Sequence, residues 1–356
     1  MLPTMQTPSV AAGRTDRQSD DTHFIYRRQE KKRLWSFIGI VVLLIAVVLY
    51  SAMTGSLRVG ALQLVQGLWT GDDAQVNVVR DLRLPRIIIA VMAGAALAVA
   101  GVLFQAVMKN PLADSGVIGI SSGAALVSLI AVTVFPALYF WMPVFSFLGG
   151  ALACLMVYMF SWRSGLHPVR LILIGVAVNA IFSGLGQSFN YRGSYAVTSI
   201  NQVTTSTLSM KKWVDVDVML WYGGIGLVLA LLVATWCNYL SLQEKTARNL
   251  GLNVTLARVL ISVVAVILAS TATAIAGVIV FIGLLIPHIG RQLVGSDHKW
   301  LIPFSALAGG LLLLLADTLG RTVLAPQEIP ASIIMAVIGG PFLIFLIRRS
   351  DVIYGR

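Results

Sequence analysis

The side chains that most often carry catalysis or bind metals are sparse in this sequence. Its histidines are His23, His167, His288 and His298. None of them stands in a His-Glu-x-x-His pattern, and the two cysteines, Cys154 and Cys237, lie far apart in separate apolar runs. The sequence also lacks a Gly-x-x-x-x-Gly-Lys-Ser/Thr loop to cradle nucleotide phosphates. We therefore expect no catalytic residue and no metal site in this chain, and any ATP must be bound by another subunit.

Charged side chains at the edges of apolar segments are a second source of chemistry. Arg83-Leu84-Pro85-Arg86 precedes a long apolar run. Its two guanidinium groups could extend toward lipid headgroups or face an external partner, and the residues alone leave both open. Asp317 and Arg321 end another apolar run four residues apart, on one face of a helix. Because an isolated charge at a membrane boundary is costly, this spacing predicts a structural ion pair.

Two polar segments interrupt the apolar pattern with turn and helix signals. Asn110-Pro111-Leu112-Ala113-Asp114 predicts a tight turn, because Pro111 prevents one helix from continuing through it. Segment 241–258 has helix-forming residues from Leu242 to Leu250, and Gly251 follows at the position of a helix stop. This segment is either a solvated connector or a docking surface for a partner protein, and composition does not decide between them.

The composition identifies the elements that must hold these groups. Of the 356 residues, 57 % are apolar and 12 % are charged, whereas a soluble domain carries about 25 % charged residues. The apolar residues gather in runs of roughly 20, the length that crosses about 30 Å of hydrocarbon as a helix. A soluble enzyme, a disordered scaffold and a disulfide-rich secreted module are excluded. The runs lie at about 35–54, 87–108, 117–135, 141–162, 171–189, 218–240, 259–290, 301–316 and 331–347.

One of these runs is too long for a single span. Val259 to Gly290 lacks any charged residue, and as one helix it would measure about 48 Å. We expect it to break into two helices near Thr271 to Gly277, where small residues cluster. The resulting ten spans place 18 of the 26 Lys and Arg residues on the cytoplasmic side, against 14 for nine spans. The positive-inside rule thus favours ten spans with both termini in the cytoplasm.

The spans divide the chain into three parts. Residues 1–34 form a basic cytoplasmic segment, predicted to be disordered until it meets anionic headgroups. Residues 35–350 form the membrane domain, and residues 351–356 form a cytoplasmic tail. The fold class is therefore all-α, a polytopic membrane protein with about ten transmembrane helices.

Several short segments together resemble the FecCD-type permeases, the membrane subunits of ABC importers for iron–siderophore, haem and vitamin B12 complexes. The resemblance covers roughly residues 35–350, with the matching segments in the same order. These segments are Arg83-Leu84-Pro85-Arg86, Gly94 to Gln105, Asn110-Pro111-Leu112-Ala113-Asp114, Gly119 to Ala124, Leu250-Gly251, Ala276-Gly277, Phe281-Ile282-Gly283-Leu284, Pro287-His288, Asp297-His298, Ala316-Asp317, Glu328-Ile329-Pro330 and Gly339-x-Pro341.

The resemblance implies a fold like that of the vitamin B12 importer permease and a role for particular residues. Those that match contacts with an extracytoplasmic binding protein are Arg83, Arg86 and Arg321. Those that match the narrow cytoplasmic gate are Asn110, Leu112, His167 and Pro168. Those that match the helix coupled to the ATPase are Glu244, Ala247, Arg248, Leu250 and Gly251.

The partners implied by the resemblance are a second permease copy or paralogue, two cytoplasmic ATPase subunits and a substrate-binding protein. ATP and Mg²⁺ would be used by the ATPase, and this chain would bind no cofactor. The expected function is import of a ferric siderophore across a bacterial cytoplasmic membrane. The same role for haem or vitamin B12 is an alternative, and so is an ion-coupled carrier that works without an ATPase.

Overall fold

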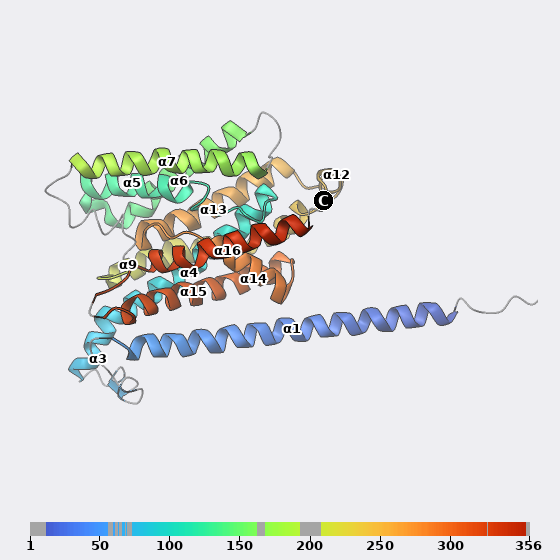
Figure 1. The fold of residues 1–356 in the computed structure, drawn as a ribbon, viewed down its shortest axis with the longest axis horizontal. Helices are drawn as coiled ribbons and strands as arrows, with labels where there is room; N and C mark the ends of the chain where they lie inside the picture. Colours follow the sequence, from blue (N-terminus) through green and yellow to red (C-terminus); the bar gives the residue numbers. More distant parts are fainter. Residues whose placement is uncertain are drawn as a thin grey trace, which may run out of the picture.

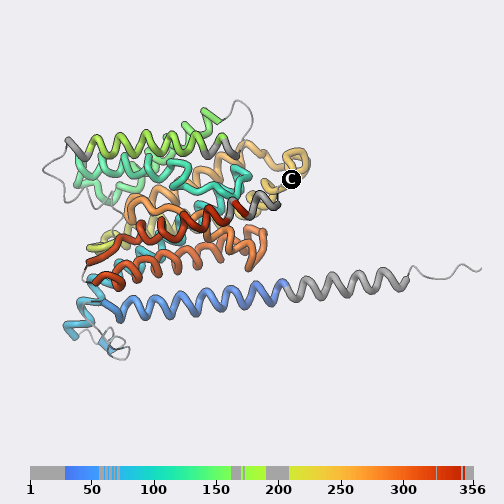
Figure 2. The backbone as a smooth tube through the Cα atoms, in the orientation of Figure 1, coloured from blue at the N-terminus to red at the C-terminus, as the bar shows by residue number. Residues whose placement is uncertain are grey.

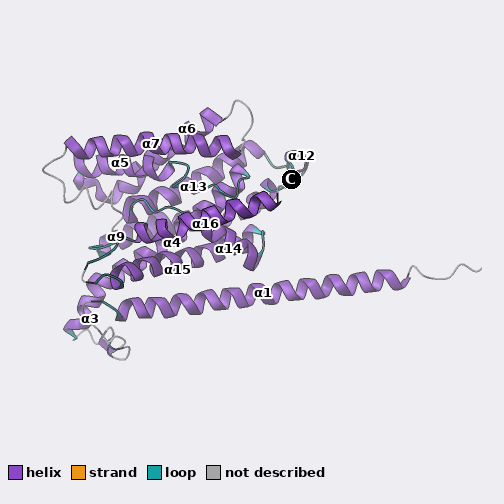
Figure 3. Ribbon diagram, in the orientation of Figure 1, coloured by secondary structure: helices purple, strands orange, loops and turns teal. Residues whose placement is uncertain are grey.

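The molecule is an all-helical bundle in the part of the chain that the structure describes. The structure is a computed structural model, and it describes residues 12–55, 73–161, 168–192, 208–325 and 327–353, with a few positions between 60 and 69. Figure 3 shows helices and loops and no strand in these residues. The all-α class predicted from the sequence is confirmed.

The long helices run roughly alongside one another (Figure 1). They are α1 (Ala12–Met53), α4 (Leu84–Met108), α5 (Ile120–Val134), α6 (Met142–Ser161), α7 (Pro168–Arg192), α13 (Val254–Ala276), α14 (Ile282–Val294), α15 (His298–Thr322) and α16 (Ala331–Ile353). Shorter helical segments complete the chain: α3 (Ala74–Val78), a π-helix (Val79–Arg83), a 3-10 helix (Pro136–Trp141), α9 (Trp213–Val218), a π-helix (Met219–Gly223), α10 (Gly224–Leu232), α11 (Ala234–Leu240) and α12 (Glu244–Asn249). We call the two ends of the bundle the α3 end and the α12 end.

Length and composition identify membrane-crossing helices among the described residues. Six are long and apolar enough to span a membrane, and three shorter helices are also apolar. These nine, together with α14, correspond to the ten predicted spans. The predicted break in the longest run is confirmed, because α13 ends at Ala276 and Gly277 follows with a φ of 80°. The chain then resumes as α14, whose 13 residues extend only about 20 Å.

Helix α4 lies at the centre of the bundle, and 83 % of its most apolar window is buried. It packs on α13, α14 and α15. Gly94 of α4 and Gly309 of α15 meet backbone to backbone, so a Cβ added to either would overlap the carbonyl of the other. Small residues at a crossing of membrane helices allow this close approach.

Helix α1 lies along one side of the bundle (Figure 2) and begins well before the apolar run. The helix begins at Ala12, within the basic segment 1–34 of the sequence analysis. Lys32 Nζ donates to the carbonyl of Gln292 at 2.7 Å, and Arg33 Nε donates to that of Val294 at 2.8 Å. These are among the last carbonyls of α14, where cations are favoured by the helix dipole. The basic run therefore has partners within the chain at the point where it joins the first span.

The α4–α15 crossing generates a stability prediction. We expect Gly309→Ala to lower the stability of the folded chain by about 1–3 kcal/mol, because the added methyl group forces two helix backbones apart. Gly224→Ala is the matched control, since no atom beyond the adjoining residues and backbone of its own helix lies within 4 Å of the Cβ that it would add. The measurement is the thermal unfolding midpoint of each variant in detergent, and equal midpoints would show that the crossing is not tightly packed.

Candidate functional site

A buried carboxylate at the α3 end is the centre of the candidate site. Asp317 lies near the end of α15 and its side chain is 2 % exposed. Arg86, in the first turn of α4, donates to both of its oxygens, from Nε at 2.9 Å and from Nη2 at 2.8 Å. Pro85 lies in the first turn of α4, directly after the π-helix Val79–Arg83. A bidentate pair between a guanidinium and a carboxylate is the strongest geometry for such a contact.

The same arginine also binds a second, exposed carboxylate. Arg86 Nη1 lies 2.9 Å from Glu328, in the loop before α16, and the Glu328 side chain is 42 % exposed. Burial raises the pKa of Glu328, but a hydrogen bond from Ser209 and the charge of Arg86 outweigh burial, so its pKa lies below 4.5. This stabilisation is present at neutral pH and is lost only as the pH falls through that lowered pKa.

The other two arginines of the site join it to the end of α1. Arg321 Nη2 donates to Ser51 Oγ at 2.5 Å, and its Nε lies 3.4 Å from Asp317, at ion-pair distance without hydrogen-bond geometry. Arg83 is buried and its Nη1 donates to the carbonyl of Ala52 at 2.9 Å. The structure thus brings together the three arginines that the sequence assigned to docking, and each has contacts within the chain.

The predicted gate turn lies at the opposite end of α4. Asn110 is buried, and its side-chain oxygen accepts a hydrogen bond from the Leu112 amide at 3.0 Å, which closes the turn. Asp114 is also buried and accepts from the Phe281 amide, in the break between α13 and α14. Leu112 is half-buried. His167 lies outside the described residues, as does the side chain of Pro168.

Polar contacts join the gate turn to the loop before α12 and link two residues within α12. Lys109, the C-cap of α4, donates from Nζ to the carbonyl of Leu242 at 2.8 Å. Glu244 begins α12 and pairs with Arg248 at 2.7 Å, one turn further along. The hydrogen bond from Arg248 and the charge of Arg258 lower the pKa of Glu244. Lys109 thus joins the predicted gate turn to the loop that precedes α12.

The residues of α12 and the two that follow it differ in their exposure to solvent. Ala247 is 2 % exposed, so it packs toward the bundle, whereas Leu250 is 60 % exposed. Gly251 has a φ of 85°, which confirms the predicted helix stop. The helix itself runs over Glu244–Asn249, shorter than the predicted Leu242–Leu250. Within 244–250 every residue except Ala247 is exposed, so a partner would meet Arg248 and Leu250 but not Ala247.

Three residues of the site carried no functional assignment in the sequence analysis. Ser51 and Glu328 complete the arginine cluster, and Lys109 joins the gate turn to α12. Glu328 lies seven residues after Arg321, and its charge beside a helix end is the signal that could have pointed to it. Ser51 carries no comparable signal, because it ends an apolar span.

Comparison with known proteins identifies the family of this chain. The model of the FecCD transport family matches residues 43–349. The chain belongs to the FecCD transport family. A relative in Staphylococcus aureus strain MSSA476, named "Probable heme-iron transport system permease protein IsdF", is 39 % identical over 91 % of this chain and 98 % of its own. The corresponding protein of strain Newman is equally similar over the same shares.

Two solved structures are similar to this chain. A metal-chelate type ABC transporter in an inward-facing conformation matches with a TM-score of 0.72 and 30 % identity, over 88 % of this chain and 98 % of its own. PsaBC from Streptococcus pneumoniae, in complex with Fab, matches with a TM-score of 0.56 and 16 % identity, over 80 % of this chain and 95 % of its own. The second likeness concerns the fold alone.

Membership in the FecCD family decides between the functional classes that the sequence left open. The chain is a non-catalytic, multi-pass permease subunit of an ABC transporter. A carrier that works without an ATPase is thereby excluded. An ABC importer permease works with an ATPase and a binding protein, which confirms these two kinds of partner.

The Arg86–Asp317 contact generates the second prediction. We expect Arg86→Gln to lower stability by about 3–5 kcal/mol, because it leaves a buried carboxylate without its bidentate partner. Arg80→Gln is the control, since its side chain is 48 % exposed. Adding Asp317→Asn to Arg86→Gln should recover part of the loss. Equal unfolding midpoints for Arg86→Gln and Arg80→Gln would contradict a structural role of the Arg86–Asp317 pair.

Proposed function

We propose that this chain forms half of the membrane pore of a binding-protein-dependent importer for an iron chelate. A second copy or a paralogue forms the other half, and two ATPase subunits that use ATP and Mg²⁺ bind the α12 end. The observation that carries this proposal is the family match over residues 43–349, joined to a cluster of three arginines at one end and an exposed helix at the other.

The proposed orientation has the α12 end in the cytoplasm of a bacterium and the α3 end outside. It is supported by the positions of the chain ends, since α1 enters from the α12 end of the bundle and α16 finishes at that same end (Figure 1). Basic residues also favour this side, with Lys32 and Arg33 before the first span and Arg348 at the end of the last.

The arginine cluster supports docking of an acidic binding protein at the α3 end. Arg86 and Arg321 are largely enclosed, with side chains 11 % and 8 % exposed, so a direct contact requires a change in their present partners. Glu328 is the exposed member of the cluster, and a carboxylate of the binding protein can replace it on Arg86. Exchange of one carboxylate for another keeps the guanidinium paired throughout.

The cargo that we propose is a ferric siderophore, as expected from the sequence. Haem is a second candidate, because the IsdF relatives named for heme-iron transport are 39 % identical over nearly their whole length. Both are iron chelates, and the described residues contain no group of three or more His, Cys, Asp or Glu side chains that could hold a bare metal ion. An importer of intact chelates needs no such group in its membrane subunit.

Uptake in reconstituted vesicles tests the proposal. The chain is reconstituted with its ATPase and binding protein, and radioactive iron is supplied either as a ferric siderophore or as haem. We expect ATP-dependent uptake of one chelate, with no uptake when the ATPase is omitted. Uptake that continues without the ATPase would contradict the importer proposal, and exclusive uptake of haem would replace the siderophore by the second candidate.

The exposed face of α12 generates a prediction on coupling. We expect Leu250→Glu to reduce co-purification of the ATPase by at least about fivefold while the permease stays folded, because the residue is exposed. Ala247→Glu should instead reduce the yield of folded permease, since it buries a charge. Wild-type co-purification and wild-type ligand-stimulated hydrolysis with Leu250→Glu would remove this face from the proposed interface.

A further inference from the structure

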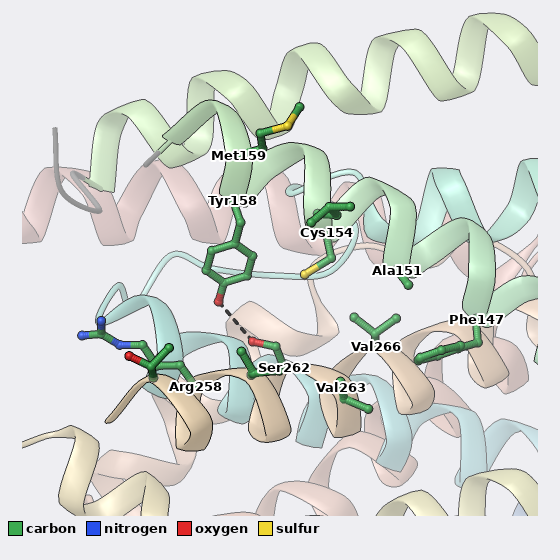
Figure 4. Close-up of a pocket in the computed structure, with 12 residues that line it drawn as sticks. Phe147, Ala151, Cys154, Tyr158, Met159, Arg258, Ser262, Val263 and Val266 are labelled. Carbon is green, nitrogen blue, oxygen red and sulfur yellow. Dashed lines mark hydrogen bonds between the residues drawn. The ribbon is translucent and has the colours of Figure 1, made fainter. Parts of the chain in front are cut away.

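A groove between α6 and α13 lies apart from both the arginine cluster and the gate turn. It encloses about 570 Å³ and is shown in Figure 4. The apolar side chains at its rim are Leu155, Met159, Val259 and Val263, and all four are exposed on the outer face of the bundle. In a membrane protein such a face meets hydrocarbon, so the groove is accessible from the lipid phase.

The length of the groove matches one leaflet of a bilayer. Its lining on α13 runs from Thr255 to Val266, and on α6 from Phe147 to Met159. At about 1.5 Å per helical residue, each wall is roughly 16–18 Å long. Half of a hydrocarbon core of about 30 Å is about 15 Å. An acyl chain lying along the groove would therefore remain within a single leaflet.

The groove is apolar along its walls and cationic at one end. Tyr158 and Ser262 are joined across it by a hydrogen bond of 3.1 Å, so these two hydroxyl groups partner each other. Arg258 lies at the end nearer α12, with its guanidinium turned away from the Tyr158 ring (Figure 4). Arg258 is the fifth residue of α13, which follows α12 after a short loop.

Arg258 has hydrogen-bonding capacity to spare. Its Nε is buried and makes no hydrogen bond to the described residues. Its Nη2 has one carboxylate partner, Glu244, at 3.5 Å, a much longer contact than the 2.7 Å between Glu244 and Arg248. The Arg258 side chain is 22 % exposed, so the outer part of its guanidinium is open to a ligand. A phosphate oxygen there would accept a charge-assisted hydrogen bond.

We propose that the groove between α6 and α13 binds an anionic phospholipid, with one acyl chain along the apolar walls and the phosphate at Arg258. The apolar walls of the groove suit an acyl chain, and Arg258 suits a phosphate group. The length of the walls fits one acyl chain. The headgroup lies at the α12 end, where anionic lipids of the cytoplasmic leaflet are found if that end faces the cytoplasm. The proposal concerns lipid binding and does not depend on which chelate is transported.

Native mass spectrometry of the full chain tests this proposal. The permease is purified in detergent and equilibrated with equal amounts of phosphatidylglycerol and phosphatidylcholine. We expect one lipid per chain to be retained, with phosphatidylglycerol preferred by at least about fivefold, since a basic residue near the headgroup contributes about 1 kcal/mol. Arg258→Gln should abolish the preference. Arg248→Gln is the matched control, because this exposed arginine also pairs with Glu244 but lies outside the groove.

A second variant tests the acyl-chain part of the proposal. Ala151→Phe fills the groove from the α6 wall and should reduce retention of both lipids severalfold, while the unfolding midpoint reports that the chain remains folded. An unchanged lipid preference in Arg258→Gln would overturn the proposal. Full competition by glycerophosphoglycerol, which has the headgroup without acyl chains, would also overturn it by showing a simple phosphate site. Loss of a permease dimer in Ala151→Phe would overturn it in favour of an interface between two chains.

Discussion

The carboxylate of Asp317 is the charge on which the α3 end of the bundle depends. A buried carboxylate is tolerated when cations and hydrogen-bond donors surround it. Arg86 supplies the bidentate contact from α4, and Arg321 adds a second positive charge from the next turn of α15. Arg321 also donates a hydrogen bond to Ser51 of α1, so α1, α4 and α15 are all linked to the Asp317 carboxylate. A cluster of polar residues thereby fixes how α1, α4 and α15 meet at this end.

Helix α4 joins this cluster to the opposite end of the molecule. Arg86 lies in its first turn and Lys109 caps its last turn, about 35 Å away along the axis. The close contacts of Gly94 and Gly101 with the backbones of α15 and α14 leave little room for α4 to shift alone. A tightly packed central helix thus connects the proposed docking site at one end to the predicted gate turn at the other.

The sequence predicted features that depend on neighbours along the chain better than features that depend on distant contacts. The break after Ala276 and the positive φ of Gly251 were both predicted, because chain length and glycine chemistry act locally. The Arg86–Asp317 contact joins residues 231 positions apart, and helical spacing instead pointed to Arg321 as the partner of Asp317. The burial of Ala247 was likewise not predicted, since the face that a short helix turns to the bundle is set by tertiary packing.

The central claim is that Arg86 exchanges Glu328 for a carboxylate of the binding protein while Asp317 holds it in place. The direct measurement is the affinity of the binding protein for the permease in detergent at fixed salt. Glu328→Gln removes the competing carboxylate and should tighten binding severalfold. Asp81→Asn makes the same change in net charge at an exposed pair on the same end and should leave the affinity within twofold of wild type. Equal or weaker binding with Glu328→Gln would contradict the account.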